Sequence, residues 1–384
     1  PDLLTLQNGK PVTSGEMWLQ QRRPGIVELF KEHQFGKAPG REEFSFKVSE
    51  SGTTALGGKA IRKQITLYFT KDTTHKADLL VYLPAGSRKP VPLFFHISFM
   101  PNNLTVDDPG IMPGKMWNRE GKQVPAVRTR AGSMLPVEQF LAEGIGVATI
   151  YYGDIEPDFA AGITQGIRGY HLKPGATKPA ANEWGAISAW AWGLSCAMDY
   201  LETDRQIDAR KVALFGVSRL GKTVLWAGAA DPRFGMVISS CSGEGGAALS
   251  RRNFGETIQH MTAPSRYFYQ FCENRATYGE DPSRSPVDAH MLIALMAPRP
   301  LLLQTGDSDN WSDPKGEWLA LKAAEPVYRM LGQTGPEAKE FPPAGIPFLS
   351  RLGYFMHAGG HGTLPEDYPV FIRFMKQHFS DNGL

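Results

Sequence analysis

The sequence has few cysteines, no long apolar run and almost no excess of charge. Its three cysteines, Cys196, Cys241 and Cys272, allow at most one disulfide bond, and their spacing is not that of a zinc site. No run approaches the roughly 18 apolar residues that a membrane-spanning helix needs. The formal net charge of +2 gives no reason to expect nucleic acid or a membrane surface as a partner. These absences favour a globular protein that binds neither.

The sequence also lacks an initiating Met and a signal peptide. Because it starts at Pro1, we expect an N-terminal segment to have been removed. Internal repeats and low-complexity segments are absent as well. The length of 384 residues fits one large α/β domain with insertions or two domains, and we predict a single domain over residues 1–384.

Apolar runs typical of buried strands alternate with segments of helical periodicity. Such alternation predicts a doubly wound, mostly parallel sheet between two layers of helices, a three-layer αβα sandwich. The strands are predicted at residues 44–48, 61–69, 77–83, 92–98, 144–152, 212–215, 236–243, 301–306 and 354–360, and the later helices at 183–201, 314–331 and 366–379.

Three segments depart from this alternation. Residues 1–40 are predicted to form an N-terminal helical arm, in which Thr13 begins a capping box and Pro24 kinks or divides the helix. Residues 101–140 and about 155–181 are irregular and too long for ordinary connections. We interpret them as insertions that border a functional site.

The most informative stretch runs from Lys211 to Trp226. An apolar, β-branched run leads into Gly216-Val217-Ser218-Arg219-Leu220-Gly221, and residues at helical spacing follow. A strand, a sharp turn with one Ser between glycines, and a helix make up the nucleophile elbow of α/β-hydrolases. The turn lifts the Ser218 hydroxyl onto a helix N-terminus, where developing negative charge is favoured. The second glycine comes one place later than in the general motif, so the alternative is a surface Ser in a strand–helix turn.

A serine nucleophile needs a base within hydrogen-bonding reach and a carboxylate that orients the base. In α/β-hydrolases these groups follow in the order Ser, acid, His. His357 and His361 follow the last strand, and His361 lies deeper in the glycine-rich loop where the base is expected. The alternative is a metal-binding pair. Spacing of i, i+4 serves a metal only on a helix, and the glycines disfavour a helix here.

The acid is expected at the end of the preceding strand, where residues 307–313 supply three aspartates. Asp313 precedes Pro314 and is better explained as a helix cap. Asp307 and Asp309 remain as candidates. The alternative is an acidic loop that only caps the helix after it.

The motif Gly216-Val217-Ser218-Arg219-Leu220-Gly221-Lys222 resembles the elbow of the glucuronoyl esterases, carbohydrate esterase family 15, which is G-C-S-R-x-G-K. Only Val217 departs from it. The resemblance implies an α/β-hydrolase fold and hydrolysis of 4-O-methyl-glucuronic acid esters, which are thought to link xylan side chains to lignin alcohols, with no cofactor and no metal. The likeness to the bacterial branch extends from about Phe35 through residues 243–257, 286–290, 297–300, Asp309-x-Trp311, Asp313-Pro314 and the His361 loop.

The resemblance also implies catalytic roles for individual residues. Ser218 attacks the ester carbonyl, and His361 serves first as base and then as acid for the leaving alcohol. Arg219 adds a guanidinium to the oxyanion hole, a fixed charge aimed at the tetrahedral intermediate.

Three further residues match the positions at which the family holds the sugar. Lys222 and Glu256 supply charged groups, which make strong hydrogen bonds to hydroxyls, and Trp311 supplies a flat apolar wall. Each has an alternative explanation. Lys222 could be solvated on a helix face, Glu256 could pair with Arg251 or Arg252, and Trp311 could belong to the core.

One position departs from the family. Many members carry the acid as a Glu on the strand after the elbow, and that position here is Cys241. A thiol does not orient and stabilise an imidazolium as a carboxylate does. Bacterial members also carry an Asp two residues before the Trp, which is Asp309 here, so the predicted triad is Ser218, Asp309 and His361. Glu244 is a less favoured substitute, because it falls three places past the expected position.

The sequence therefore predicts a metal-independent serine esterase that acts on uronic-acid esters of glucuronoxylan through an acyl-enzyme. The alternatives are an acetyl-xylan or general carboxylesterase, and a non-catalytic carbohydrate-binding homologue. Because xylan is too large to enter a cell readily, we expect a secreted or periplasmic location. The sequence assigns no oligomeric state.

Overall fold

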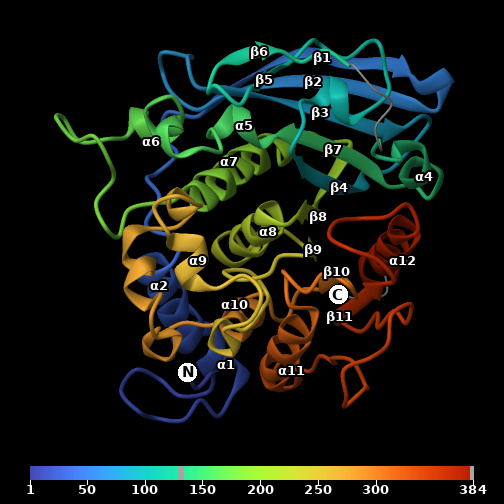
Figure 1. Ribbon diagram of the computed structural model, residues 1–384. Helices are drawn as coiled ribbons and strands as arrows, with labels where there is room; N and C mark the ends of the chain where they lie inside the picture. The colour runs from blue at the N-terminus through green and yellow to red at the C-terminus, as the bar shows by residue number, and fades with distance from the viewer. Residues whose placement is uncertain (129–133, 381–384) are drawn as a thin grey trace. The chain divides into compact units, whose positions relative to one another are not determined.

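The computed structural model describes residues 1–128 and 134–380 (Figure 1). Contacts between segments, many of them far apart in the sequence, group the chain into two compact units. That the chain is a single domain over residues 1–384 stays a prediction. Unit 1 comprises Pro1–Ala38, Ala180–Ser188 and Phe215–Leu384, and unit 2 comprises Pro39–Pro179 and Ala189–Leu214.

In unit 2 the strands follow one another across the sheet in the order β1, β2, β3, β7, β4 and β8, and the last three residues of β8 belong to unit 1. The pairs β1–β2, β2–β3 and β3–β7 are antiparallel, whereas β4 and β7 are parallel. The connections from β1 to β3 are short, and short connections require antiparallel pairing, because a parallel partner needs a crossover of a dozen residues or more. The bounds are β1 Ser45–Ala55, β2 Ala60–Tyr68, β3 Lys76–Pro84, β4 Val91–Ser98, β7 Gly146–Tyr151 and β8 Ile207–Val217.

Burial along these strands follows their apolar pattern. Every residue of β7 is buried, and a continuous apolar run is what a strand covered on both faces requires. β1 is exposed along nearly its whole length and lies at the edge of the sheet. The predicted strands are thus confirmed, although β1 and β8 are longer than the apolar runs that indicated them.

The two predicted insertions contain short elements that the sequence analysis missed. The second is anchored by a buried ion pair between Arg168 and Glu156, with 2.8 Å between nitrogen and oxygen. Their place beside a functional site stays a prediction, and residues 129–133 lie outside the described residues. The elements are α3 Asn102–Thr105, the antiparallel pair β5 Lys115–Trp117 and β6 Gln123–Pro125, α4 Val137–Ala142 and α6 Ile167–Tyr170, with α5 Tyr152–Ile155 directly after β7.

In unit 1 the strands β9, β10 and β11 pair in parallel in that order. Parallel pairing brings the C-terminal ends of the strands to one edge, where open α/β sheets bind their ligands. Helices precede or follow each of these strands. The bounds are β9 Met236–Ser240, β10 Leu301–Gly306, β11 Leu352–His357, α8 Arg219–Ala230, α9 Ile258–Thr262, α10 Ala289–Ala294, α11 Pro314–Met330 and α12 Asp367–Phe379, while α7 Ala186–Leu201 runs through both units.

Helices cover both faces of β11. A Cβ on Gly353 would lie 3.1 Å from Phe374 of α12. The next residue, Tyr354, packs on Trp318 of α11 with ring centroids 5.1 Å apart. Because successive strand residues point to opposite faces, α11 and α12 lie on opposite sides of the strand. This part of unit 1 therefore has the predicted three layers.

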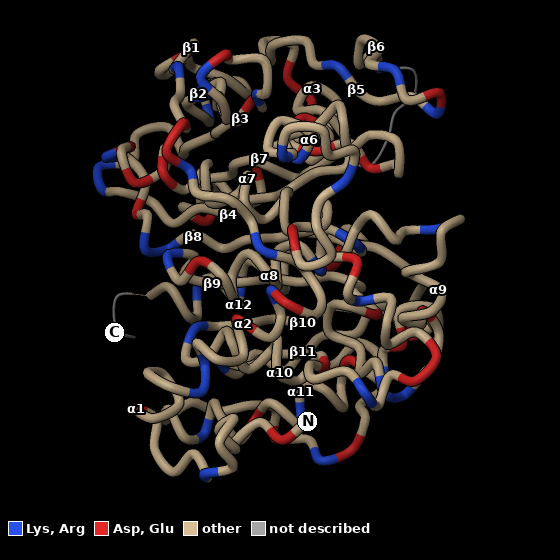
Figure 2. Tube along the Cα trace, turned by 90° about the vertical axis from the view of Figure 1, so that its left-hand side faces the viewer, with Lys and Arg blue, Asp and Glu red and all other residues tan. Residues whose placement is uncertain are grey.

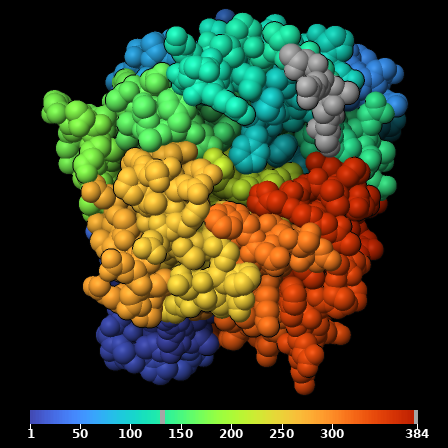
Figure 3. All heavy atoms as spheres, viewed as in Figure 1, coloured from blue at the N-terminus to red at the C-terminus, as the bar shows by residue number. Residues whose placement is uncertain are grey.

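The N-terminal arm is helical as predicted, with α1 (Gly15–Met17) and α2 (Arg23–His33) joined by one π-helical turn. The predicted cap at Thr13 is wrong by one residue. Ser14 has the extended backbone of a cap, and its hydroxyl accepts the N–H of Met17 at 3.1 Å. Pro24 stands in the first turn of α2, where the π-helical turn ends, and the backbone stays helical on both sides of that boundary. Figure 3 shows this arm in dark blue against unit 1 residues coloured yellow and orange.

Basic and acidic residues are interspersed along both units (Figure 2). Among the described helices, none is both long and apolar enough to cross a membrane. Cys196, Cys241 and Cys272 are buried, and none of the three forms a disulfide.

Candidate active site

Ser218 stands at the turn between β8 and α8, where the nucleophile elbow was predicted. Its φ of 60° and ψ of −125° belong to a region that L side chains rarely adopt, at a cost of about 1–3 kcal/mol. The Ser218 N–H donates to the carbonyl of Ser240 at 2.8 Å, and the Lys222 N–H donates to the carbonyl of Ser218 at 3.0 Å. The serine hydroxyl does not cap α8. These bonds hold a strained turn that leaves the hydroxyl available.

The displaced glycine of the motif has a packing reason. A Cβ on Gly216 would lie 2.3 Å from the carbonyl oxygen of Leu220, so the two arms of the turn leave no room for a side chain. A Cβ on Gly221 would lie 2.7 Å from the carbonyl oxygen of Ser240, at the end of β9. Gly221 therefore permits α8 to pass close to the neighbouring strand.

His361 and Asp309, the base and the acid predicted from the sequence, are hydrogen bonded to each other. Nδ1 of His361 lies 2.7 Å from Oδ2 of Asp309. The Asp309 side chain is buried, whereas that of His361 is 40% exposed. Burial alone would raise the pKa of Asp309, but hydrogen bonds from His361 and Ser312 outweigh it and hold the pKa below its usual value. Asp309 is thus kept ionised and is placed to orient the imidazole.

Cys241, at the position where the family carries a Glu, lies against the loop that holds His361. The Gly362 N–H donates to the Cys241 sulfur at 3.3 Å. Burial raises the pKa of this thiol to about 12, so the thiol is neutral. It contacts the loop but supplies no charge to an imidazolium.

The other candidate carboxylates are engaged elsewhere. Asp307 accepts the N–H of Gly359 at 2.9 Å. Asp313 caps α11, as expected from the sequence. Glu244 is buried in an ion pair with Arg275. Each of these three carboxylates therefore binds a backbone N–H or a cation instead of the ring of the predicted base.

Lys222 and Glu256 come together in a buried ion pair. Nζ lies 3.0 Å from Oε2, and the two side chains are 1% and 9% exposed. The Glu256 N–H donates to the carbonyl of Trp311 at 2.8 Å, which ties the pair to the loop after β10. The indole of Trp311 is 47% exposed. The three predicted sugar-binding residues thus combine a desolvated charge pair with an exposed flat ring.

The alternative explanations of these residues are wrong. Lys222 is not solvated, and Trp311 is not in the core. Arg251 and Arg252 each pair with an aspartate rather than with Glu256.

The guanidinium of Arg219 lies over the ring of Tyr267, with its central carbon 5.0 Å from the ring centroid. This geometry is that of a cation–π contact, which orients the cation without neutralising it. The sequence analysis missed Tyr267, because it lies in an aperiodic stretch far from the elbow in the chain.

Two more polar residues reach the site without a signal in the sequence. The hydroxyl of Ser312 lies 3.2 Å from Nδ1 of His361. Glu317 of α11 accepts the N–H of Gly243 at 2.9 Å and the hydroxyl of Ser242 at 3.3 Å. Complete burial raises the pKa of Glu317 to about 8. A Glu in the first turn of a helix is ordinarily explained by the helix dipole, so its buried place was not foreseen.

Cys241, Asp309 and His361 also form the one group of three or more potential metal-ligating side chains in the described part of the chain whose ligand atoms all lie within 4.8 Å of one another. Sulfur, carboxylate oxygen and imidazole nitrogen are zinc donors. Here the imidazole nitrogen is already bonded to Asp309, and the thiol is protonated. His357, the partner in the alternative metal pair, is bound instead to Asp367. The donor set therefore fits an acid–base pair better than a metal centre.

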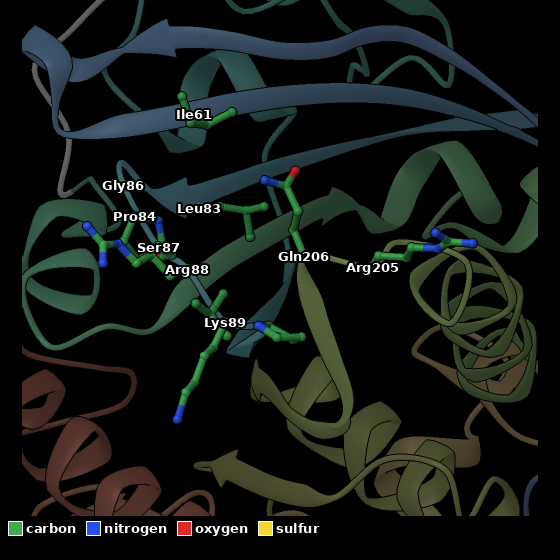
Figure 4. A pocket seen from close by; sticks show the side chains of 11 residues that line it. Ile61, Leu83, Pro84, Gly86, Ser87, Arg88, Lys89, Arg205 and Gln206 are labelled. Atoms are coloured by element: carbon green, nitrogen blue, oxygen red, sulfur yellow. The ribbon is translucent and has the colours of Figure 1, made fainter.

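A pocket of about 120 Å³ lies in unit 2, and none of the predicted catalytic residues lines it (Figure 4). It is smaller than the roughly 300–1,000 Å³ of ordinary ligand sites. Arg88, Lys89 and Arg205 contribute to its lining, but Figure 4 shows these three side chains extending in different directions. They do not converge on a common anion.

Comparison with known proteins yields one family. A family model described as glucuronyl esterase, fungi, matches residues 116–332. The chain is 43% identical over 389 residues to carbohydrate esterase MZ0003 from an unknown prokaryotic organism, covering 99% of this chain and 89% of that protein.

Solved structures agree. A glucuronoyl esterase from Solibacter usitatus superposes with a TM-score of 0.93 at 42% identity, covering 98% of this chain and 97% of that one. A structure described as a promiscuous CE15 esterase from the marine bacterial metagenome gives a TM-score of 0.89 at 43% identity, covering 98% and 96% of the two chains.

Proposed function

Because the chain belongs to the glucuronoyl esterases, carbohydrate esterase family 15, we propose that it hydrolyses esters of glucuronic or 4-O-methyl-glucuronic acid through an acyl-enzyme on Ser218. Esters between glucuronoxylan and lignin alcohols are of this class. The observation that carries the proposal is the 2.7 Å hydrogen bond between His361 and Asp309 at the same strand ends as the serine turn. Ser240, at the end of β9, accepts the N–H of Ser218 and lies 3.3 Å, hydroxyl to hydroxyl, from Thr363.

The residues supply the parts of a serine-esterase cycle. With Nδ1–H donated to Asp309, Nε2 of His361 is left to accept the proton of Ser218 as its Oγ attacks the ester carbonyl. Asp309 stabilises the imidazolium that forms, which then protonates the leaving alcohol. Water then attacks the acyl-enzyme while His361 again serves as the base. The uronic acid is released, and Ser218 regains its proton.

Arg219 gives the oxyanion a fixed positive charge. It is the residue directly after Ser218, so its guanidinium starts from the N-terminal turn of α8, where the helix dipole also favours negative charge. The contact with Tyr267 restrains it. Such preorganised donors are worth about a hundredfold or more in rate each.

Lys222, Glu256 and Trp311 form the wall for the sugar. Charged groups in a desolvated pair make strong, directional hydrogen bonds to hydroxyls, and an exposed indole suits the apolar face of a pyranose. An acetyl group alone needs no such wall. We therefore place the sugar ring of the acyl group, rather than the alcohol, against these residues.

A broader carboxylesterase activity that includes acetyl esters is the second candidate. The relative from the marine metagenome is described as promiscuous, and this chain is 43% identical to it. The third candidate, a non-catalytic carbohydrate-binding protein, rests on Cys241 in place of the family's Glu, and the hydrogen bond between His361 and Asp309 weighs against it.

We also propose that the protein acts outside the cytoplasm, secreted or periplasmic, because a xylan-linked ester is too large to enter a cell readily. None of the proposed steps needs a cofactor.

The test is kcat and KM on the methyl and benzyl esters of glucuronic acid and on an acetyl ester, for the unmodified protein and for Asp309→Ala. We expect activity on the glucuronate esters and a loss of about two orders of magnitude or more in Asp309→Ala, the scale at which an orienting carboxylate acts. Labelling of Ser218 by a fluorophosphonate is expected in the unmodified protein.

Each candidate has its own outcome. Activity on the acetyl ester alone would favour the second candidate. No turnover together with no labelling would favour the third. Full activity in Asp309→Ala would remove Asp309 from the triad.

A further inference from the structure

The loop that carries His361 has little rigidity of its own. It runs from the end of β11 at His357 to the start of α12 at Asp367. Three of the five residues 358–362 are glycines, which restrict the backbone less than any other residue. The place of the proposed base must therefore be set by contacts that the loop makes with fixed groups.

His357 and Asp367 close this loop at its two ends. Nδ1 of His357 lies 2.9 Å from Oδ2 and 3.1 Å from Oδ1 of Asp367. The two side chains are 2% and 0% exposed. Oδ2 of Asp367 also accepts the N–H of Leu364 at 2.7 Å, which draws the second half of the loop onto the same carboxyl group. The closure is thus shielded from solvent.

The second ring nitrogen of His357 reaches the first half of the loop. Its Nε2 lies 3.1 Å from the carbonyl oxygen of Gly360. A carbonyl oxygen only accepts, so Nε2 carries the proton and donates it. The amide nitrogen of Gln304 also lies 3.1 Å from Nδ1. The ring has contacts on both nitrogens and does not turn without losing one.

We propose that His357 is a positioning residue for the base His361, acting through the carbonyl of Gly360. Gly360 and His361 share a peptide unit, so the hydrogen bond from Nε2 fixes the plane from which the side chain of His361 departs. A displacement of about 1 Å in such a group costs up to a hundredfold in rate. The proposal rests on the proposed function, in which His361 is the base.

The test uses two amide variants of His357, each of which replaces only one of the two ring nitrogens. The amide of Gln reaches about as far as Nε2, and the amide of Asn about as far as Nδ1. His357→Gln keeps a donor for the Gly360 carbonyl and loses the contact with Asp367. His357→Asn keeps the contact with Asp367 and loses the donor for Gly360. On the methyl ester of glucuronic acid we expect His357→Asn to lower kcat ten- to a hundredfold with KM little changed. His357→Gln is expected to retain most of kcat.

A merely structural role gives a different result. Loss of packing would lower the unfolding temperature of both variants and would leave kcat per folded molecule unchanged. Equal kcat in the two variants, after correction for the folded fraction, would overturn the proposal. Should His357→Asn fail to fold, Asp367→Asn takes its place: it weakens the anchor of the ring, and an unchanged kcat there would overturn the proposal as well.

His361→Ala separates this proposal from the one on which it rests. An active His361→Ala variant would remove His361 as the base, and with it the proposed function. An inactive His361→Ala beside a fully active His357→Asn would overturn only the positioning role.

Discussion

The thiol of Cys241 lies where a carboxylate could serve the proposed base. Its sulfur, an oxygen of Asp309 and a ring nitrogen of His361 all lie within 4.8 Å of one another. Two places for an acid thus flank one imidazole, and in this chain the carboxylate stands at the one after β10. Two buried carboxylates at that distance would repel each other, which is a physical reason for a neutral group at the other place.

A carboxylate at position 241 should therefore replace a missing Asp309. We expect Cys241→Glu in the Asp309→Ala background to regain about tenfold or more of the lost kcat on a glucuronate ester. Cys241→Gln in the same background is the control, because it has the same size and no charge. Equal activity of the Glu and Gln variants would contradict the prediction.

Glu317 gives the folded protein a dependence on pH. Burial raises its pKa to about 8, whereas in the unfolded chain a Glu ionises near 4.3. As the pH rises, the unfolded state therefore releases this proton before the folded state does. The contribution of Glu317 to the free energy of unfolding is highest below pH about 4 and falls as the pH rises toward 8.

Glu317→Gln removes that titration and keeps the oxygen that accepts from Gly243 and Ser242. We expect the variant to equal the unmodified protein in stability near pH 4 and to exceed it near pH 8, by on the order of a few kcal/mol at most. Urea unfolding at the two pH values measures the difference. A gap of the same size at both values would show that ionisation is not its cause.

The residues that could be predicted from the sequence are those whose chemistry has a local signature. Ser218 lies in a turn motif, and His361 and Asp309 lie at the ends of apolar strands. Glu317 and Ser312 could not be predicted, because their partners are a backbone N–H and an imidazole that only the folded chain brings near.

Helices and strands could be predicted where the apolar periodicity extended over several turns of a helix or several residues of a strand. α11, α12 and the buried strands were predicted within a few residues. The cap of α1 was not, since Thr13 and Ser14 both have hydroxyls, and only the hydrogen bond that Ser14 accepts from the Met17 N–H identifies the cap. The β5–β6 pair was missed, because strands of three residues have no period to detect.

The packing of α8 on β9 depends on one missing methyl group. A Cβ at Gly221 would lie 2.7 Å from the carbonyl oxygen of Ser240 and 3.1 Å from the hydroxyl oxygen of Ser239. We expect Gly221→Ala to force the helix from the strand, with a loss of about 1–3 kcal/mol in unfolding free energy and a fall in activity.

Gly25 is the matched control. It lies in α2, and a Cβ there would meet only the Gln7 amide nitrogen, at 3.9 Å. Gly25→Ala is expected to raise the unfolding free energy by about 0.5–1 kcal/mol, because alanine favours a helix. Thermal or urea unfolding of both variants measures this, and a stabilised Gly221→Ala would contradict the close approach.

For the whole molecule, the family and the α/β-hydrolase fold predicted from the elbow motif are confirmed. The alternation of strands and helices along the sequence also indicated this fold. The division of the chain into two units follows from contacts between distant segments, among them residues 1–38 with residues 215 onward, and no composition shift in the sequence marks it.

The cysteines predict a property of the intact fold. All three are buried and form no disulfide, and burial raises the pKa of Cys241 to about 12 and of Cys272 to about 11. We expect a thiol reagent such as Ellman's to react slowly with the native protein at pH 8 and to count three thiols in guanidinium. A reducing agent should leave the unfolding temperature unchanged. Rapid reaction of one thiol in the native state would contradict this.

The turn at Ser218 has a consequence for how this fold can change. Its φ of 60° is a conformation that glycine adopts freely and serine does not. Ser218→Gly would therefore relax the backbone, and the protein would gain stability while losing its proposed nucleophile. Selection for a sturdier fold alone thus runs against activity at this position, and the serine persists only where turnover itself is selected.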